Sequence, residues 1–283
     1  MIKKFFRQLA FATLSVMAAG VSATPITTTG LELWLDASAI STGTTAVSTW
    51  ADQSGHGRDA TATGATSTPT YIASNSLFSN RPTVSFDGGD FLNSALASVM
   101  NITGNSARTI FFVFSQDSAA SRNIFGYGAS SSLALFDVAA AGQEISGHFH
   151  GTPFVNGSQT FALNQMTVGA VRYNGTAFQT YQHDTSFNGQ TASTAYSLNT
   201  SDSAFNIGRG AYSGYNSFNG DIAELLVYSR ALSDSELSAV DSYLNTKYTT
   251  TAATITVPEP ASLLLVCIGL VGLGVVRQKR IHI

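Results

Sequence analysis

Cysteine is nearly missing from this chain of 283 residues. The only cysteine, Cys267, lies in an apolar run close to the C-terminus. The rest of the sequence therefore cannot form a disulfide within the chain, and thiol chemistry is excluded there. A folded domain in this chain has to be stabilised by its hydrophobic core.

Basic side chains are scarce outside the two termini. Residues 24–250 contain eight Lys and Arg against sixteen Asp and Glu, a net charge of −8. Such an acidic surface argues against nucleic acid and anionic membranes as partners. The G-x-S-x-G, H-E-x-x-H and G-x-x-x-x-G-K-S/T motifs are also absent from the sequence, so the serine-hydrolase, zinc-protease and nucleotide-binding signatures are missing.

Residues 1–23 have the three-part pattern of a secretory signal peptide. A basic start with Lys3, Lys4 and Arg7 is followed by an apolar run at 9–19 and by small residues at 21–23. The apolar run is too short for an ordinary membrane-spanning helix. We expect signal peptidase to remove this segment and the rest of the chain to be exported.

A second apolar segment, at residues 261–276, ends in a basic cluster formed by Arg277, Lys279 and Arg280. As a helix it would be about 24 Å long, slightly less than the hydrocarbon thickness of a typical bilayer. The sequence therefore predicts a short transmembrane segment whose basic end stays in the cytoplasm.

Pro258, Glu259 and Pro260 stand directly before this segment. With the apolar run and the basic cluster they resemble the PEP-CTERM sorting signal, over residues 257–283. The resemblance implies that an exosortase of a Gram-negative bacterium cuts the chain near this motif. The protein would then be anchored only transiently in the inner membrane, before delivery to the cell surface or secreted polysaccharide. The polar tract at 249–256, rich in threonine, is interpreted as a linker.

The central segment is predicted to be all-β. Residues 109–114 form a short apolar, β-branched run that suits a buried strand. Residues 166–173 and 177–183 flank Asn174-Gly175, which predicts a hairpin with positive φ at both turn positions. Short strands separated by glycine-containing turns are typical of a sandwich or barrel.

One helix is expected after residue 232. Ser233 and Glu236 have the spacing of a capping box, and Leu237, Val240 and Leu244 follow at helical intervals. We expect this helix to close one end of the β-structure.

Five motifs along the chain resemble the laminin G-like members of the concanavalin A-like lectin/glucanase superfamily. They occupy, in the family's order, residues 33–37, 50–55, 84–88, 218–224 and 228–233. The resemblance spans most of residues 30–248 and implies a domain at 24–248 built as a two-sheet antiparallel jelly roll. It does not fix a function, because this superfamily contains glycosidases, lectins and protein-binding modules. Trp34, Trp50, Phe86, Phe111 and Phe114 lie in or next to motif strands and are predicted to be core residues.

Glycoside hydrolysis needs two carboxyl groups about 5 to 9.5 Å apart. The glucanases of the superfamily carry them in a Glu-x-Asp-x-x-Glu pattern, which does not occur here. Glu32 and Asp36 could share a strand face, but their spacing of about 13 Å is too large. The sequence does not test a catalytic pair formed by two carboxylates from different strands. We nevertheless expect a non-catalytic domain, with no catalytic residues.

The sequence contains candidate ligands for two metals, zinc and calcium. His148 and His150 would point to one face of a strand, and a zinc site would need His183 as a further ligand. We favour the alternative that His148 and His150 are two polar residues on a solvated strand face.

For calcium, Asp87 and Asp90 flank a glycine loop that could wrap the ion. The alternative is that these carboxylates hydrogen-bond their own turn. Asp36, Asp52 and Asp59 form a second acidic group with the same two interpretations.

A glycine- and serine-rich loop at 210–217 contains Tyr212, Tyr215 and Asn216. Exposed aromatic faces beside amide groups suit neutral sugar rings, so we predict a ligand site here. The alternative is that both tyrosines fold back over the sandwich edge.

These observations predict an exported protein whose domain binds extracellular polysaccharide or a surface protein. Two alternatives are kept: a glucanase-like hydrolase, and a structural or adhesion module without a defined ligand.

Overall fold

The computed structural model describes residues 26–41, 45–120, 122–153, 155–157, 159–183, 190–211 and 217–250. The predicted signal peptide and the whole PEP-CTERM segment, with Pro258, Glu259, Pro260, Arg277, Lys279 and Arg280, lie outside the described residues. Among the described residues, no helix is both long and apolar enough to cross a membrane.

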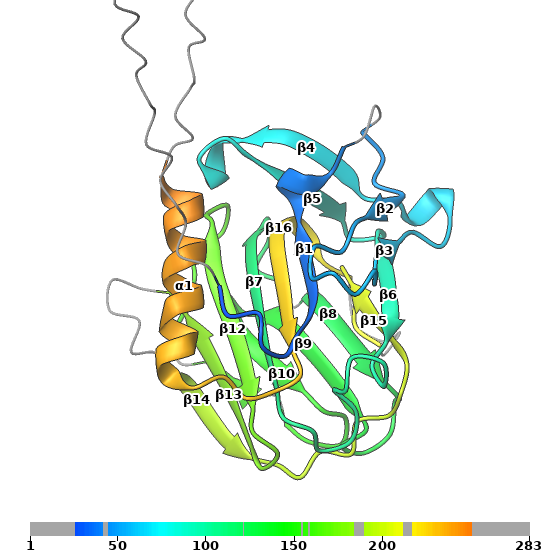
Figure 1. Ribbon diagram of the computed structural model, residues 1–283, viewed down its shortest axis with the longest axis vertical. Coiled ribbons are helices and arrows are strands. Elements are labelled where there is room, and N and C mark those ends of the chain that lie inside the picture. The colour runs from blue at the N-terminus through cyan, green and yellow to red at the C-terminus, as the bar shows by residue number, and fades with distance from the viewer. Residues whose placement is uncertain are drawn as a thin grey trace, which may run out of the picture.

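The described strands form two antiparallel sheets of eight strands each, which confirms the predicted sandwich (Figure 1). Sheet A has the order β14 (Gln190–Ala195), β13 (Ala177–Gln182), β12 (Thr167–Tyr173), β7 (Arg108–Gln116), β16 (Asn219–Tyr228), β5 (Arg81–Asp87) and β4 (Thr70–Asn75), with β1 (Leu31–Asp36) also paired to β16. Sheet B has the order β11 (Val155–Asn156), β10 (Glu144–His148), β9 (Leu135–Ala141), β8 (Arg122–Gly128), β15 (Ala204–Ile207), β6 (Leu92–Leu96), β3 (Ala60–Thr61) and β2 (Thr49–Trp50).

The main core fills the space between the two sheets and is rich in aromatic rings. Trp50, Phe86 and Phe114 are buried there, as predicted. Phe112 and Phe125 come from opposite sheets and meet edge to face, with ring centroids 5.4 Å apart. Strands β7 and β16 lie in the middle of sheet A and are buried over almost their whole length, since one face meets sheet B and the other meets a helix.

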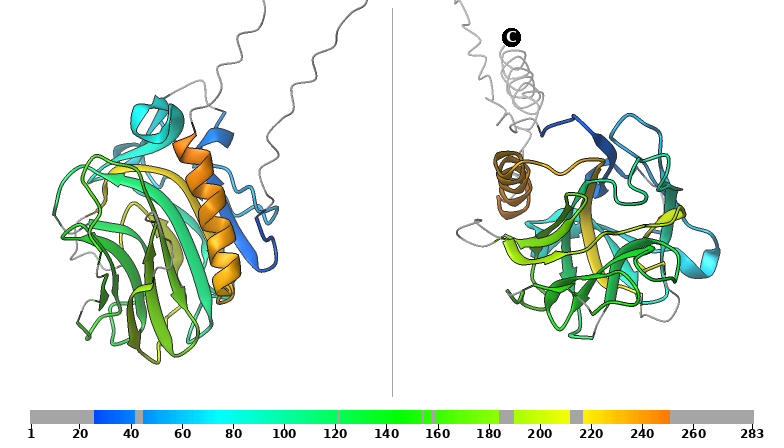
Figure 2. Two further views of the ribbon diagram at one scale, coloured as in Figure 1. Left: turned by 90° about the vertical axis from the view of Figure 1, so that its left-hand side faces the viewer. Right: turned by 90° about the horizontal axis from the view of Figure 1, so that it is seen from below.

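That helix is α1 (Asp234–Thr249), and it packs on the outer face of sheet A (Figure 2). A second apolar cluster joins Leu237, Val240 and Leu244 of α1 to the outward side chains of sheet A, among them Phe111. The expected capping box between Ser233 and Glu236 is present. The expectation that the helix closes one end of the sandwich is wrong, because its apolar stripe lies flat on a sheet face.

The predicted hairpin is formed by β12 and β13. Only Gly175 has a positive φ, 96°, so the expectation of positive φ at both turn positions is wrong. The loop has three residues, and Oδ1 of Asn174 accepts hydrogen bonds from the backbone N–H of Thr176 and Ala177 at 3.0 and 2.8 Å. The asparagine therefore organises the turn through its side chain.

Trp34 is half-buried and does not belong to the core between the sheets. Its indole Nε1 donates to Oε1 of Glu224 at 2.7 Å on the outer face of sheet A. The prediction of a core position for Trp34 is therefore wrong, because Leu33 and Leu35 on either side point into the core and strand alternation turns Trp34 outward.

Candidate functional site

The loop predicted to bind ligand is tied to sheet B at both ends. Tyr212, Tyr215 and Asn216 themselves lie outside the described residues. Before them, the backbone N–H of Ala211 donates to Oδ1 of Asp137 on β9 at 2.8 Å. After them, Ser217 forms a parallel bridge with Asn123 on β8. The sequence-predicted site thus begins and ends at sheet B.

A row of paired residues crosses one face of sheet B from strand to strand. We call it the polar row, and it consists of His148, Asp137, Gly126, Asn206, Asn93 and Thr61 on β10, β9, β8, β15, β6 and β3. Strands in a sheet are about 4.8 Å apart, so the polar row is roughly 24 Å long. That length matches several linked sugar rings or a short extended peptide better than a single small molecule.

The polar row points away from the core. Its neighbours along the strands, such as Val138, Ile207 and Leu92, belong to the core between the sheets. Since successive side chains of a strand point to opposite faces, the polar row lies on the outward face. Burial changes along it: Asp137 and His148 are buried, Asn93 is half-buried and Thr61 is exposed. The polar row therefore opens to solvent at its β6 and β3 end.

Asp137 occupies a niche formed by two glycines. A Cβ atom at Gly126 would lie 1.9 Å from Oδ1 of Asp137, and one at Gly210 would lie 2.4 Å from Oδ2. Any other residue at these positions would collide with the carboxylate. The niche lets the chain at 210–211 approach β9 closely enough for Asp137 to hold the start of the loop.

His148 lies beside Asp137 in the polar row. Burial, together with the nearby His150, lowers the pKa of His148, which keeps its ring neutral at pH 7. The expectation of a solvated strand face is wrong for His148, which is only 4% exposed. His183 lies elsewhere, with Nδ1 2.6 Å from Oδ2 of Asp241 on α1. Within the described parts of the chain, no three metal-ligating side chains gather, and the trio considered for zinc is not brought together.

Amide groups line the open half of the polar row. Oδ1 of Asn206 accepts from Nε and Nη2 of Arg209 at 3.3 and 3.2 Å. The Arg209 guanidinium stacks 3.4 Å from the ring centroid of Phe91. Oδ1 of Asn93 and Nδ2 of Asn123 have no hydrogen-bond partner among the described residues. Both atoms are buried, so the hydroxyl groups of a ligand reach them only when the amide groups turn outward.

Asp87 and Asp90 lie at the turn between β5 and β6. Oδ1 of Asp87 accepts from the backbone N–H of Gly89 at 2.8 Å, and Oδ2 of Asp90 accepts from that of Asp87 at 3.3 Å. Burial raises the pKa of the Asp90 carboxyl. Both carboxylates are thus engaged with their own turn, as the alternative to a calcium site requires.

The acidic group near the start of the chain is engaged in a similar way. Oδ1 of Asp52 accepts from the backbone N–H of Trp34 at 3.0 Å, and its Oδ2 accepts from that of Arg58 at 3.0 Å. Oδ1 of Asp59 accepts from the backbone N–H of Asp52 at 2.9 Å. Their carboxylates connect β1 to the segment that follows it.

Two carboxylates from different strands meet at Lys247 of α1. Its Nζ donates to Oδ2 of Asp36 at 2.6 Å and to Oε2 of Glu224 at 2.7 Å. Two carboxylates that share one cation are candidates for a glycosidase pair, but Glu224 is fully buried and also accepts from the Tyr248 hydroxyl at 2.9 Å. Burial raises the pKa of Glu224, although Lys247 opposes the shift. This buried network fastens α1 to sheet A.

Sequence reasoning missed the polar row, although parts of it were visible. Phe136-Asp137-Val138 and Phe205-Asn206-Ile207 each place one polar residue between two apolar ones, the pattern of a strand with one polar face. What the sequence does not reveal is the register that aligns these polar residues across neighbouring strands.

Two eight-stranded antiparallel sheets around one aromatic core define a jelly-roll sandwich of the lectin and glucanase type. A model of the concanavalin A-like lectin/glucanases superfamily matches residues 87–238, more than half of the chain. The chain belongs to this superfamily. A model of the PEP-CTERM protein-sorting motif matches residues 256–280, which confirms the C-terminal resemblance and supports export to the surface of a Gram-negative bacterium. A search among curated proteins found no match.

Solved structures with the same fold include carbohydrate-active enzymes and a domain of one. Trypanosoma rangeli sialidase in complex with 2,3-difluorosialic acid is 14% identical, with a TM-score of 0.54 over 78% of this chain and 34% of the sialidase. This chain thus spans about a third of that enzyme. Domain 4 of AbnA, a GH43 extracellular arabinanase from Geobacillus stearothermophilus in complex with arabinotriose, is 15% identical, with a TM-score of 0.54 over 74% of this chain and 96% of that domain. An arabinofuranosidase complexed with arabinofuranosyl-α-1,2-xylobiose is 14% identical, with a TM-score of 0.54 over 71% and 51% of the two chains. At such identities the likeness shows the fold alone.

Proposed function

We propose that this protein is an exported surface or matrix protein whose jelly-roll domain binds neutral polysaccharide without cleaving it. The observation that carries the proposal is the polar row, which opens to solvent at Asn93 and Thr61 and includes Asp137, the residue that holds Ala211 at the start of the predicted ligand loop. A sorting signal that directs proteins to the cell surface brings such a face to secreted polysaccharide. A surface protein is the other partner that the same face could take.

The chemistry of the open half favours neutral sugar. Asn93 and Thr61 contribute polar groups without net charge. The Asn206 amide is already engaged with Gly126, Ala204 and Arg209, and the Arg209 guanidinium also stacks on Phe91. Tyr212 and Tyr215 would add aromatic faces, each worth about 1 kcal/mol, so we expect a dissociation constant on the order of 0.1 to 1 mM. Arrays of linked sugars would bind more tightly through repeated contacts.

Binding to a glycan array tests the proposal. We expect the full-length protein to retain neutral polysaccharides, and Asn93→Ala to weaken binding about 3- to 10-fold through the loss of a hydrogen bond. Asn199→Ala is the matched control, because Asn199 is exposed and lies outside the polar row. Changing Tyr212 and Tyr215 together to Ala should abolish binding. Equal binding by Asn93→Ala and wild type would remove the polar row from the site, and no binding to any glycan would leave a structural module.

Calcium is tested in the same experiment. Arrays probed with and without millimolar calcium, followed by thermal unfolding in both conditions, would report an ion at Asp87 and Asp90. An ion that binds only the folded state raises the melting temperature by mass action. No difference in either measurement assigns these carboxylates to the turn alone.

A hydrolase is the second candidate, and one carboxyl pair favours it. Asp117 and Asp221 lie near each other, because the backbone N–H of Asp117 donates to the carbonyl oxygen of Asn219 at 3.3 Å and Asp221 pairs with Ser115. Partial desolvation, followed by the charge of Asp221, raises the pKa of the exposed Asp117 carboxyl, as expected of a general acid beside a second carboxylate. Release of reducing sugar from neutral polysaccharides tests this reading, with Asp117→Asn as the inactive variant. Activity that Asp117→Asn abolishes would replace the non-catalytic proposal.

A further inference from the structure

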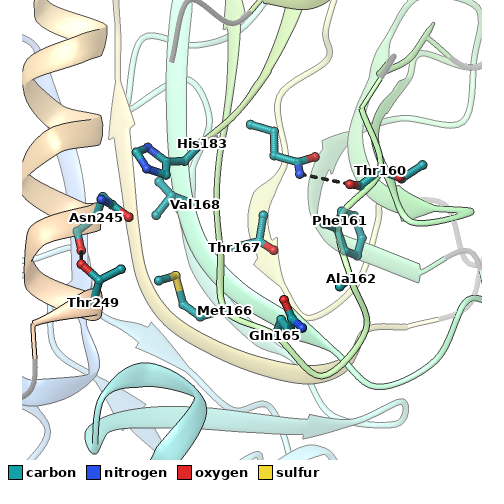
Figure 3. Close-up of a pocket in the computed structure, with 11 residues that line it drawn as sticks. Thr160, Phe161, Ala162, Gln165, Met166, Thr167, Val168, His183, Asn245 and Thr249 are labelled. Carbon is teal, nitrogen blue, oxygen red and sulfur yellow. Dashed lines mark hydrogen bonds between the residues drawn. The ribbon is translucent and has the colours of Figure 1, made fainter. Parts of the chain in front are cut away.

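A cavity of about 280 Å³ lies at the end of sheet A where β12 begins and β13 ends, between α1 and the segment at 160–165 (Figure 3). Figure 3 shows Asn245 and Thr249 of α1 on one side and Thr160, Phe161 and Gln165 on the other, with Met166 and Thr167 between them. Pockets for drug-sized ligands have volumes of about 300 to 1,000 Å³. The cavity therefore suits one small ring better than a chain of several.

The cavity wall is polar but carries almost no charge. Gln165, Gln182 and Asn245 contribute amides, and Phe161 and Met166 contribute apolar surface. No Asp, Glu, Lys or Arg is found among the described residues that line it. A wall of this kind is complementary to a neutral molecule with hydroxyl groups on its edge and C–H groups on its face.

Gln182 lines this cavity, and its side-chain amide is not fully hydrogen-bonded within the fold. Its side chain is 9% exposed, and Oε1 has no hydrogen-bond partner among the residues that the structure describes. Its Nε2 reaches only the carbonyl oxygen of Thr160, at 3.5 Å. An unpaired buried carbonyl is costly, and rotation about the broad terminal torsion of glutamine can turn the amide toward the cavity. A ligand hydroxyl would supply the missing donor.

The opposite wall is held in a fixed position. Nδ1 of His183 lies 2.6 Å from Oδ2 of Asp241, which is buried in α1. The interaction fixes the orientation of the imidazole at the cavity wall and ties the end of β13 to the helix. The cavity is therefore bounded by side chains with defined positions on both sides, as a binding site requires.

We propose that this cavity binds a single neutral sugar ring, as a second carbohydrate site independent of the polar row. Hydroxyl groups of the ring pair with the amides of Gln182 and Asn245, and the C–H face of the ring packs on Met166 and Phe161. With the polar row on sheet B and this cavity at the end of sheet A, one domain would hold two glycan chains together. A protein sorted into secreted polysaccharide would then act as a cross-linker.

Saturation-transfer NMR on the full-length protein in detergent tests this proposal. D-glucose and L-arabinose are the neutral probes, and D-glucuronate and D-glucosamine are the charged ones. We expect saturation of a neutral probe and little of the charged probes. Gln182→Met removes the amide at nearly constant volume, so binding should weaken about tenfold while the melting temperature is retained or rises. Asn245→Phe should block the cavity, and Ser242→Phe, on the exposed surface of α1, is its matched control.

The expected results distinguish ligand binding at the cavity from ligand binding at the polar row. Asn93→Ala should leave binding of the small probe unchanged, and Gln182→Met should leave retention on the glycan array unchanged. A melting temperature that falls in Gln182→Met would assign the amide a structural role and overturn the proposal. Equal binding by wild type, Gln182→Met and Asn245→Phe, or no saturation of any neutral probe, would also overturn it.

Discussion

Glu236 makes four hydrogen bonds although its side chain is partly exposed. Its carboxylate accepts from Nη1 and Nη2 of Arg230 at 2.8 and 2.7 Å, and from the backbone N–H and hydroxyl of Ser233 at 2.9 and 3.0 Å. These contacts, led by those from Arg230, lower the pKa of Glu236 to about 2. Because the lowered pKa reflects stabilisation of the ionised form in the folded state, it makes stability depend on pH.

The sign of that dependence is set by the lowered pKa. The stabilisation is fully present above the ordinary value of 4.5 and is lost as the pH falls through about 2. We therefore expect Glu236→Gln to lower the melting temperature at pH 7 and to have little effect near pH 2, as measured by thermal unfolding at a series of pH values. Glu144→Gln on β10 is the control, because no ion pair involves Glu144 among the described residues. An equal loss for Glu236→Gln at both pH values would contradict the assignment.

Helix α1 depends on the buried network at its C-terminal end. Lys247 there neutralises Glu224, which is fully buried. Lys247→Met would leave Glu224 buried without its cation, and removal of one partner of such a pair costs about 3 to 5 kcal/mol. Urea unfolding should show a loss of this size. Asp234→Asn at the other end of α1 removes only an ion pair with a carboxylate that is 89% exposed, and should cost less than about 1 kcal/mol. Equal losses in both variants would show that the network does not hold the helix.

At the scale of elements, the sequence predicted individual helices and strands correctly, but it did not predict where α1 packs. The capping box of Ser233 and Glu236 and the apolar run at 109–114 predicted α1 and β7, because caps and buried strands are encoded by residues close together in the chain. The position of α1 on sheet A could not be predicted. It depends on Phe111 and Leu226, which sheet pairing brings to one face although they are distant in sequence.

At the scale of the whole molecule, the candidate site also depends on contacts between residues that are distant in sequence. Sequence reasoning selected a loop whose two ends, at Ala211 and Ser217, do lie on sheet B. It did not select Asp137 or Asn206, because these residues belong to the candidate site only through the strand register that places them in one row with Asn93. Register is a property of strand pairing and is not visible in any single strand.

Processing at both ends is the prediction that concerns the entire chain. Cells that contain an exosortase should release a product that begins near Thr24 and ends near Pro258, and intact-mass measurement of the secreted protein checks both ends. Replacing Arg277, Lys279 and Arg280 with neutral residues should impair membrane retention and orientation, because basic residues keep that end in the cytoplasm. The same replacement at Arg58, within the exported domain, should leave sorting intact. A secreted product that still carries residues 261–283 would refute exosortase cleavage, and with it the delivery of both carbohydrate sites to the extracellular matrix.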